Sequence, residues 1–175
     1  IFWSENMLGF NKEDFIIGIL PGSRQEAIEN LIKILDVTQH IYKLSSKYKF
    51  CLSLAPQISQ SKLDEKLKMT DWIRNENKLT HPSGCKVTIS MSFGDVLGIS
   101  KAIIGLAGTA NEQAVYSGRP VFCFEGTGPQ STSLRFEEQS KLLGKKLIFL
   151  KNKHTKILAK YIVLDLKRLS LPKNP

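Results

Sequence analysis

Two short stretches of the chain combine glycine with polar residues in a way that could hold an anionic ligand. Residues 20–24 read Leu-Pro-Gly-Ser-Arg, and residues 105–109 read Gly-Leu-Ala-Gly-Thr. Each follows an apolar run, as expected for a turn between a buried strand and a helix. Glycine lets the backbone bend and lets a ligand approach it closely. Because the free N–H groups at the start of a helix attract phosphate, we expect both stretches to be phosphate-binding turns.

The side chains after each turn predict where the helices begin. Ser23 with Glu26, and Thr109 with Glu112, have the Ser/Thr-x-x-Glu spacing of a capping box. This spacing predicts helices that start at Ser23 and at Thr109. Glu112 then has two possible roles. It could only complete the capping box, or it could bind ribose hydroxyls, as an acid near a phosphate turn often does.

Arg24 and the loop 125–131 are further candidates for ligand contact. Arg24 lies in the first turn of the predicted helix, where a positive charge opposes the helix dipole. It could pair with Glu26 or another acid, but its place beside free N–H groups favours a phosphate or diphosphate. The loop reads Glu-Gly-Thr-Gly-Pro-Gln-Ser. It could simply connect two elements, although loops at this edge of a sheet carry function.

An alternation of strands and helices positions these turns. Apolar runs predict strands over 15–20, 50–55, 86–90, 102–104, 121–124 and 146–150. Apolar spacing and capping signals predict helices over 23–46, 59–75, 93–99, 109–117, 134–143 and 155–169, and turn residues predict a loop over 77–84. This alternation predicts an α/β fold, a three-layer, doubly wound parallel sheet. Both turns then lie at its carboxyl edge, where such folds bind ligands.

Composition and charge narrow the classes of protein. The chain has 175 residues, 42% of them hydrophobic, which suffices for one domain with a core. No apolar run approaches the ~18–20 residues of a transmembrane helix. The net charge is +9, and residues 141–175 carry all of it, with ten bases and one acid. This basic segment is either a solvated face or a surface for anionic lipid or an acidic partner domain. Nucleic acid is disfavoured, because aromatic residues are not interleaved with the lysines.

Several catalytic and metal-binding signatures are missing from the sequence. There is no Gly-x-x-x-x-Gly-Lys-Ser/Thr loop, no Gly-x-Gly-x-x-Gly after the first strand, and no Gly-x-Ser-x-Gly elbow. No Asp-x-Asp pair is present to hold a metal–nucleotide complex, so we expect no metal. Cys51, Cys85 and Cys123 are too widely spaced for a disulfide framework or a metal pair. They read as small buried hydrophobes in a reducing compartment, which favours a cytoplasmic protein.

The two turns together resemble a known family. Residues 20–24 and residues 108–112, Gly-Thr-Ala-Asn-Glu, are similar to the carboxyl-terminal half of lipid-A-disaccharide synthase. The resemblance is closer to the proteins described as lipid-A-disaccharide-synthase-related. Residues 117–121, 126–130 and 136–144 fit that related group, whereas the loop 126–130 departs from the synthase itself. The similarity covers about residues 16–150.

This resemblance implies the two-domain GT-B fold of nucleotide-sugar glycosyltransferases. Residues 15–170 would be its second, Rossmann-like domain, which binds the donor, with 1–14 a linker from an absent amino-terminal domain and 171–175 a tail. The implied reaction transfers a hexose or N-acetylhexosamine from a UDP-sugar, with inversion and without a cofactor, to a lipid-linked acceptor. The acceptor site and the catalytic base would belong to the absent domain, so the fragment alone would be inactive. The alternatives are a non-hydrolysing nucleotide-sugar epimerase and a non-catalytic interaction domain that keeps the fold.

The resemblance also assigns roles to individual residues. Arg24 and the backbone of residues 108–110 would hold the diphosphate, Glu112 would bind the ribose, and residues 125–130 would face the sugar. The expected ligand-binding residues are Gly22, Ser23, Arg24, Gly108, Thr109, Ala110, Glu112, Glu125, Gly126, Thr127, Gly128 and Gln130. The charge of the basic segment 141–175, independently of the resemblance, predicts that it faces the partner domain or an anionic membrane.

Overall fold

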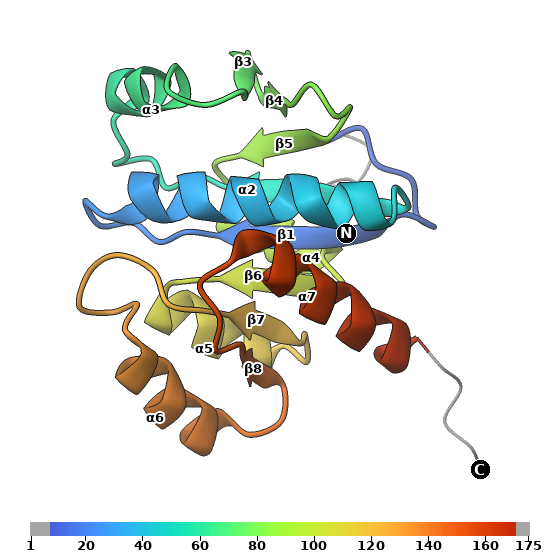
Figure 1. The fold of residues 1–175 in the computed structure, drawn as a ribbon, viewed down its shortest axis with the longest axis vertical. Coiled ribbons are helices and arrows are strands. Elements are labelled where there is room, and N and C mark those ends of the chain that lie inside the picture. The colour runs from blue at the N-terminus through green and yellow to red at the C-terminus, as the bar shows by residue number, and fades with distance from the viewer. Residues whose placement is uncertain (1–7, 171–175) are drawn as a thin grey trace.

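A computed structural model describes residues 8–170, which form an eight-stranded sheet covered by helices (Figure 1). The strands are β1 (Phe15–Leu20), β2 (Tyr48–Ser53), β3 (Ile73–Asn75), β4 (Lys78–Thr80), β5 (Lys86–Ser90), β6 (Ala102–Gly105), β7 (Val121–Cys123) and β8 (Leu147–Phe149). The helices are α2 (Ala27–Leu44), α3 (Gln60–Leu67), α4 (Phe93–Ile99), α5 (Gly108–Tyr116), α6 (Ser133–Leu143) and α7 (Thr155–Leu169).

The order of the strands is that of a Rossmann-like sheet. It runs β3-β4-β5-β2-β1-β6-β7-β8, and all pairs from β5 to β8 are parallel. The chain starts in the middle with β1, winds outward to β5, then crosses back and winds outward to β8. This reversal beside β1 is the arrangement that binds ligands in doubly wound folds. The predicted α/β fold is confirmed.

The sequence prediction for residues 59–84 was wrong in two places. The helix predicted over 59–75 ends at Leu67, and the loop predicted over 77–84 contains a strand. β3 and β4 instead form an antiparallel hairpin that extends the sheet beyond β5. Trp72 and Leu79 are its buried anchors, while Ile73 stays exposed. Because each strand has three residues, neither is long enough to display a period-2 apolar pattern.

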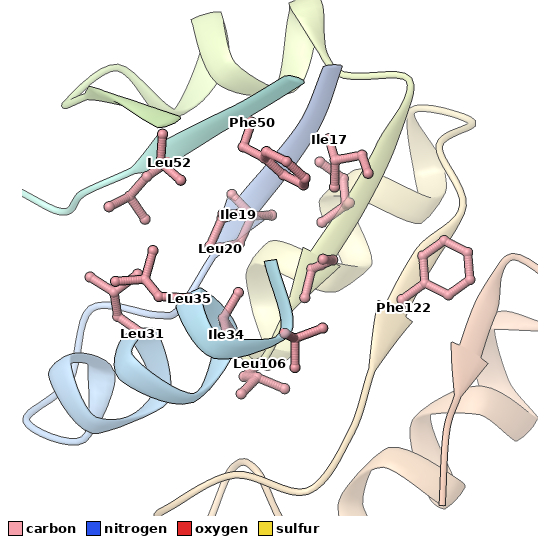
Figure 2. Close-up of a cluster of buried hydrophobic side chains, with 14 of the residues drawn as sticks. Ile17, Ile19, Leu20, Leu31, Ile34, Leu35, Phe50, Leu52, Leu106 and Phe122 are labelled. Atoms are coloured by element: carbon pink, nitrogen blue, oxygen red, sulfur yellow. The ribbon is translucent and has the colours of Figure 1, made fainter. Parts of the chain in front are cut away.

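Helices cover both faces of the sheet. Figure 1 shows α2 and α7 packed together in front of the sheet, with α4 and α5 behind it. Figure 2 shows Leu31, Ile34 and Leu35 of α2 directed at the buried side chains of β1 and β2, Ile19 and Leu52 among them. Burying such side chains contributes about 1.5–3 kcal/mol each, so this face anchors α2 firmly.

A smaller apolar cluster lies behind the sheet and involves the start of the described chain. Phe10 is buried there with Ile16, Cys51, Val96 and Ile99, and Leu8 packs against them. Residues 8–10, within the predicted linker, therefore pack on the domain. Residues 1–7 and the predicted tail 171–175 lie outside the described residues.

The three cysteines are buried and free, as their scattered positions predicted. Burial raises the pKa of the Cys51 and Cys85 thiols to about 12. Burial also raises the pKa of Cys123. Since thiolates are the reactive form, these residues serve packing rather than chemistry in the folded protein.

Within residues 8–170, none of the helices combines the length and the apolar character that crossing a bilayer requires.

Candidate functional site

A cleft of about 350 Å³ opens at the carboxyl ends of the central strands. β1 and β6 are neighbours in the sheet, and the turns that follow them lead into α2 and α5 on opposite faces (Figure 1). Both turns line the cleft. The two candidate phosphate turns of the sequence therefore meet at one site.

The turn after β1 is longer than the sequence predicted. α2 begins at Ala27 rather than Ser23, its N-cap is Glu26, and no side chain caps it. The predicted Ser23 capping box is wrong, because residues 23–26 form a separate turn in which the N–H of Ala27 donates to the Arg24 carbonyl (3.0 Å). Gly22 supplies the positive φ, 107°, that redirects the chain.

This longer turn leaves Ser23 and Arg24 exposed on the rim of the cleft. Among residues 8–170, the Arg24 guanidinium forms no ion pair and no hydrogen bond, so the alternative pairing with Glu26 is not observed. A guanidinium without a protein partner can bind an anionic ligand without first breaking an ion pair.

The turn after β6 is shorter, and its helix starts earlier than predicted. α5 begins at Gly108 with Ala107 as its N-cap, and no side chain caps it, so the predicted Thr109 capping box is wrong. Thr109 is instead the second residue of the helix. The N–H groups of the first helical turn have no acceptor within the helix. Gly108, Thr109 and Ala110 all line the cleft, which therefore receives the positive end of the α5 dipole.

Asn111 fixes the path of this second turn. Its side chain is fully buried, and its Nδ2 donates to the Gly105 carbonyl (3.0 Å). A Cβ on Gly105 would lie 2.0 Å from the Asn111 Oδ1. The asparagine thus occupies the space that any side chain at position 105 would need, so glycine is required there.

The remaining wall of the cleft is partly apolar. Ala55 and Pro56 follow β2, and Met91 and Phe93 follow β5, so this wall also comes from the carboxyl edge of the sheet. Met91 lines the cleft and is 54% exposed, so its side chain is accessible from the cleft. The cleft therefore joins a partly apolar wall to a wall that carries Arg24 and the amino terminus of α5.

The expected ligand-binding residues divide into three groups. Seven of them line the cleft: Gly22, Ser23, Arg24, Gly108, Thr109, Ala110 and Gln130. Glu112 is exposed and lines a neighbouring groove of about 240 Å³, which shares Gly108, Thr109 and Gln130 with the cleft. The other four, Glu125, Gly126, Thr127 and Gly128, do not line either hollow, and the loop they form packs against α2.

Several cleft residues were not among the expected ligand-binding residues. Glu26, Asn30 and Ser131 all line the cleft, and Asn30 and Ser131 are almost fully buried. The available signal was Asn30, a polar residue within the apolar stripe of the first helix. A buried polar side chain in such a stripe needs hydrogen-bond partners outside its own helix.

The remaining observations concern a lysine beside the cleft and the groups that could hold a metal ion. Burial lowers the pKa of Lys33, which reaches from α2 to the Glu125 carbonyl (2.5 Å) beside the cleft. In the described part of the chain, no group of three or more His, Cys, Asp or Glu side chains is placed to hold a metal ion.

Solved structures share this fold. TarM superposes with a TM-score of 0.57 at 16% identity, covering 89% of this chain and 28% of TarM. A second structure is a point mutant of S. aureus TarM in complex with fondaparinux, α-GlcNAc-glycerol and UDP. It superposes with a TM-score of 0.54 at 18% identity, and the match covers 89% of this chain and 29% of that one. E. coli ADP-heptose LPS heptosyltransferase II superposes with a TM-score of 0.58 at 12% identity, and the match covers 97% of this chain and 52% of the enzyme.

No family model matches the sequence, and neither does any curated protein. The chain spans between 28% and 52% of the length of the solved structures named above. At identities of 12–18%, the likeness concerns the fold alone. The chain therefore has a Rossmann-like α/β fold of the kind found in GT-B glycosyltransferases.

Proposed function

We propose that this chain is the donor-binding domain of a glycosyltransferase that uses a nucleotide sugar. The observation that carries the proposal is the cleft at the reversal point of the sheet, which is lined both by the amino terminus of α5 and by Arg24, a residue whose guanidinium has no partner among residues 8–170. A volume of about 350 Å³ lies within the range of small-molecule sites. Its mixed walls match a ligand with both a phosphate group and a flat, less polar group.

The named structural neighbours support this class of ligand. One TarM structure contains UDP, and the heptosyltransferase is named for ADP-heptose. A nucleoside diphosphate in the cleft would place its phosphates at Arg24 and at the N–H groups of residues 108–110. The apolar wall at Met91 and Phe93 would then receive the base. Glu112, in the adjoining groove, would accept hydrogen bonds from the ribose hydroxyls, and Gln130 would contact the sugar.

The finer assignment rests on the sequence resemblance. We propose a UDP-sugar donor, transfer of a hexose or N-acetylhexosamine to a lipid-linked acceptor, and kinship with the lipid-A-disaccharide-synthase-related proteins. We further propose that the catalytic base and the acceptor site belong to another domain of a longer protein. The basis is that the cleft-lining residues include Glu26 but no second acid and no histidine.

A calorimetric titration of the purified chain tests the proposal. UDP, GDP, ADP and CMP, and the corresponding nucleotide sugars, are titrated in the presence and absence of EDTA. We expect weak binding of at least one nucleoside diphosphate, unchanged by EDTA, and no sugar transfer or hydrolysis by the chain alone. The absence of heat with every nucleotide would contradict the donor site, and measurable turnover would contradict a catalytic base on another domain.

We also propose that the basic segment 141–175 contacts an anionic membrane surface. On α7, Lys156, Lys160 and Lys167 are exposed, and Tyr161 and Leu164 are exposed among them at 45% and 51%. Basic residues interspersed with apolar ones suit the surface of an anionic bilayer. Binding to vesicles that contain phosphatidylserine should weaken as salt rises from low to physiological, because charges are screened over ~10 Å. If the chain does not bind such vesicles even at low salt, the segment does not contact anionic lipid.

A further inference from the structure

The side-chain amide of Asn30 forms hydrogen bonds with the loop 125–131, nearly one hundred residues away in the sequence. Asn30 lies on the buried face of α2 and is 2% exposed. Its Oδ1 accepts a hydrogen bond from the N–H of Thr127 (2.7 Å). Its Nδ2 donates to the Thr127 carbonyl and to the Ser131 Oγ, both at 3.3 Å. One side chain thus binds the loop 125–131 at two positions.

Ser131 extends this connection to the opposite side of the cleft. It is 1% exposed, and its Oγ donates to the carbonyl of Leu106, in the turn between β6 and α5 (2.8 Å). Its own carbonyl accepts from the N–H of Gly126, which closes the loop on itself (2.8 Å). The hydrogen bonds therefore run from α2 through the loop to the turn that presents the start of α5.

Two glycines show how closely the loop approaches α2. A Cβ on Gly126 would lie 2.6 Å from the Asn30 Oδ1 and 3.0 Å from Leu106. A Cβ on Gly128 would lie 2.6 Å from the Glu26 Oε1, and Gly128 has a positive φ of 95°. A side chain at Gly126 would have to displace the buried Asn30 or Leu106, and one at Gly128 would have to move the Glu26 side chain and adopt a positive φ. The two glycines are thus matched to Asn30 and Glu26.

We infer that Asn30 is a positioning residue for the ligand site, which rests on the proposed function. Through Thr127 and Ser131 it holds the loop 125–131 against α2, so that Gln130 and Ser131 form a fixed wall of the cleft. The same connection sets the turn after β6 relative to α2. The alternative is that Asn30 only satisfies buried polar groups, in which case its loss would lower stability and leave ligand affinity unchanged.

Gln39 is a matched control for this distinction. It is a second amide on the buried part of α2, 4% exposed, and its Nε2 donates to the Asp36 Oδ1 within the same helix (3.1 Å). It does not line the cleft. Asn30→Ala and Gln39→Ala each truncate a buried amide on the same helix, but only the first removes hydrogen bonds to the loop 125–131.

The experiment measures affinity by calorimetry at a temperature where every variant is folded, with the tightest binder among UDP, GDP and ADP as the probe. We expect Asn30→Ala to weaken binding about tenfold, because the loop loses its three hydrogen bonds to the Asn30 side chain and keeps only the one from Lys33 to the Glu125 carbonyl. Gln39→Ala should bind as the wild type does. Wild-type affinity in Asn30→Ala would overturn the inference. If Asn30→Ala does not fold, Ser131→Ala replaces it, with a loss of affinity again expected and an unchanged affinity contradictory.

Amide hydrogen exchange separates this inference from the proposed function. In Asn30→Ala, we expect faster exchange at Gly126, Thr127 and Ser131, with no such change in Gln39→Ala. If the wild type binds no nucleotide, the proposed function fails, but this exchange pattern would still support the positioning of the loop by Asn30. Unchanged exchange across the loop would overturn the inference, whatever the wild type binds.

Discussion

The two turns that meet in the cleft have the same sequence signal and different structures. Both carry Ser/Thr-x-x-Glu after an apolar strand. The turn after β1 runs through residues 21–26 before α2 begins, and it presents the charged side chain of Arg24. The turn after β6 has two residues, and it presents the main-chain N–H groups of α5.

Under the proposed function, this difference means that the ligand site combines two ways of attracting an anion. A side-chain charge is strong and mobile, whereas helix N–H groups are weaker and fixed in direction. The two turns also need glycine for different reasons. Gly22 is needed for its positive φ, and a Cβ there would only meet the Ala107 Cβ at 3.5 Å. Gly105 is needed because Asn111 leaves no room beside it.

The largest effect should come from exchanging these glycines for alanine. Gly105→Ala should lower the free energy of unfolding by about 3 kcal/mol, because the new Cβ overlaps the buried Asn111. Gly22→Ala should cost about 1–2 kcal/mol, the strain of a positive φ. Urea unfolding of both variants measures the two values. Equal losses, or a larger loss for Gly22→Ala, would show that the two turns do not differ in this way.

The next largest effect should come from removing the charge of Arg24, which tests the contribution of the first turn to UDP binding. Arg24→Gln should weaken binding of UDP by about 1.5–3 kcal/mol, the value of a hydrogen bond to a charged group. Its unfolding should not change, because Arg24 has no partner among residues 8–170. Arg74→Gln is the control, since Arg74 pairs with Asp64 outside the cleft (3.4 Å). If calorimetry finds that the two variants bind UDP with equal affinity, Arg24 does not contribute to UDP binding.

A smaller effect is expected at the adjoining groove. Glu112→Gln should weaken the binding of UDP about tenfold, because a charged acceptor for the ribose hydroxyls is lost. The affinity for pyrophosphate, which has no ribose, should stay the same. Competition titrations with the two ligands provide the comparison. A parallel loss for both ligands would mean that Glu112 acts on the phosphate site and not on the ribose.

The smallest effect concerns the start of α5. Thr109→Ala should change stability by no more than about 0.5 kcal/mol, because Thr109 lies inside the helix, where alanine is favoured. Ser92→Ala should cost about 1 kcal/mol, because the Ser92 Oγ caps α4 by accepting from the N–H of Asp95 (3.3 Å). Thermal unfolding compares the two. A loss for Thr109→Ala as large as that for Ser92→Ala would restore the capping role of Thr109.

Much of the fold could be predicted from the sequence because its elements carry independent signals. The strand over 15–20 is an uninterrupted apolar run, and the helix over 155–169 has a clear apolar stripe; both coincide with β1 and α7. The helix predicted over 93–99 is confirmed, and Ser92 caps it. The hairpin of β3 and β4 could not be predicted in this way, since its strands are stabilised by pairing with β5 rather than by their own composition.

The candidate site was predictable in its position but not in its details. Two glycine turns that follow parallel strands were predicted to lie at the carboxyl edge of the sheet, and they line one cleft there because β1 and β6 are neighbours. The spacing Ser/Thr-x-x-Glu misplaced both helix starts, because capping depends on the direction in which the chain enters the helix. The role of Asn30 depends on the contact between α2 and a loop far away in the sequence, which no local pattern indicates.

The most direct test of the central claim is a chemical-shift titration of the isotopically labelled chain with UDP. If the cleft binds the diphosphate, the amide signals of Gly22, Gly108, Thr109 and Ala110 should shift together, with one common dissociation constant. The amides of α7, which lie outside the cleft, should not move. Shifts confined to α7 and the basic segment, or no shifts at saturating UDP, would contradict the account.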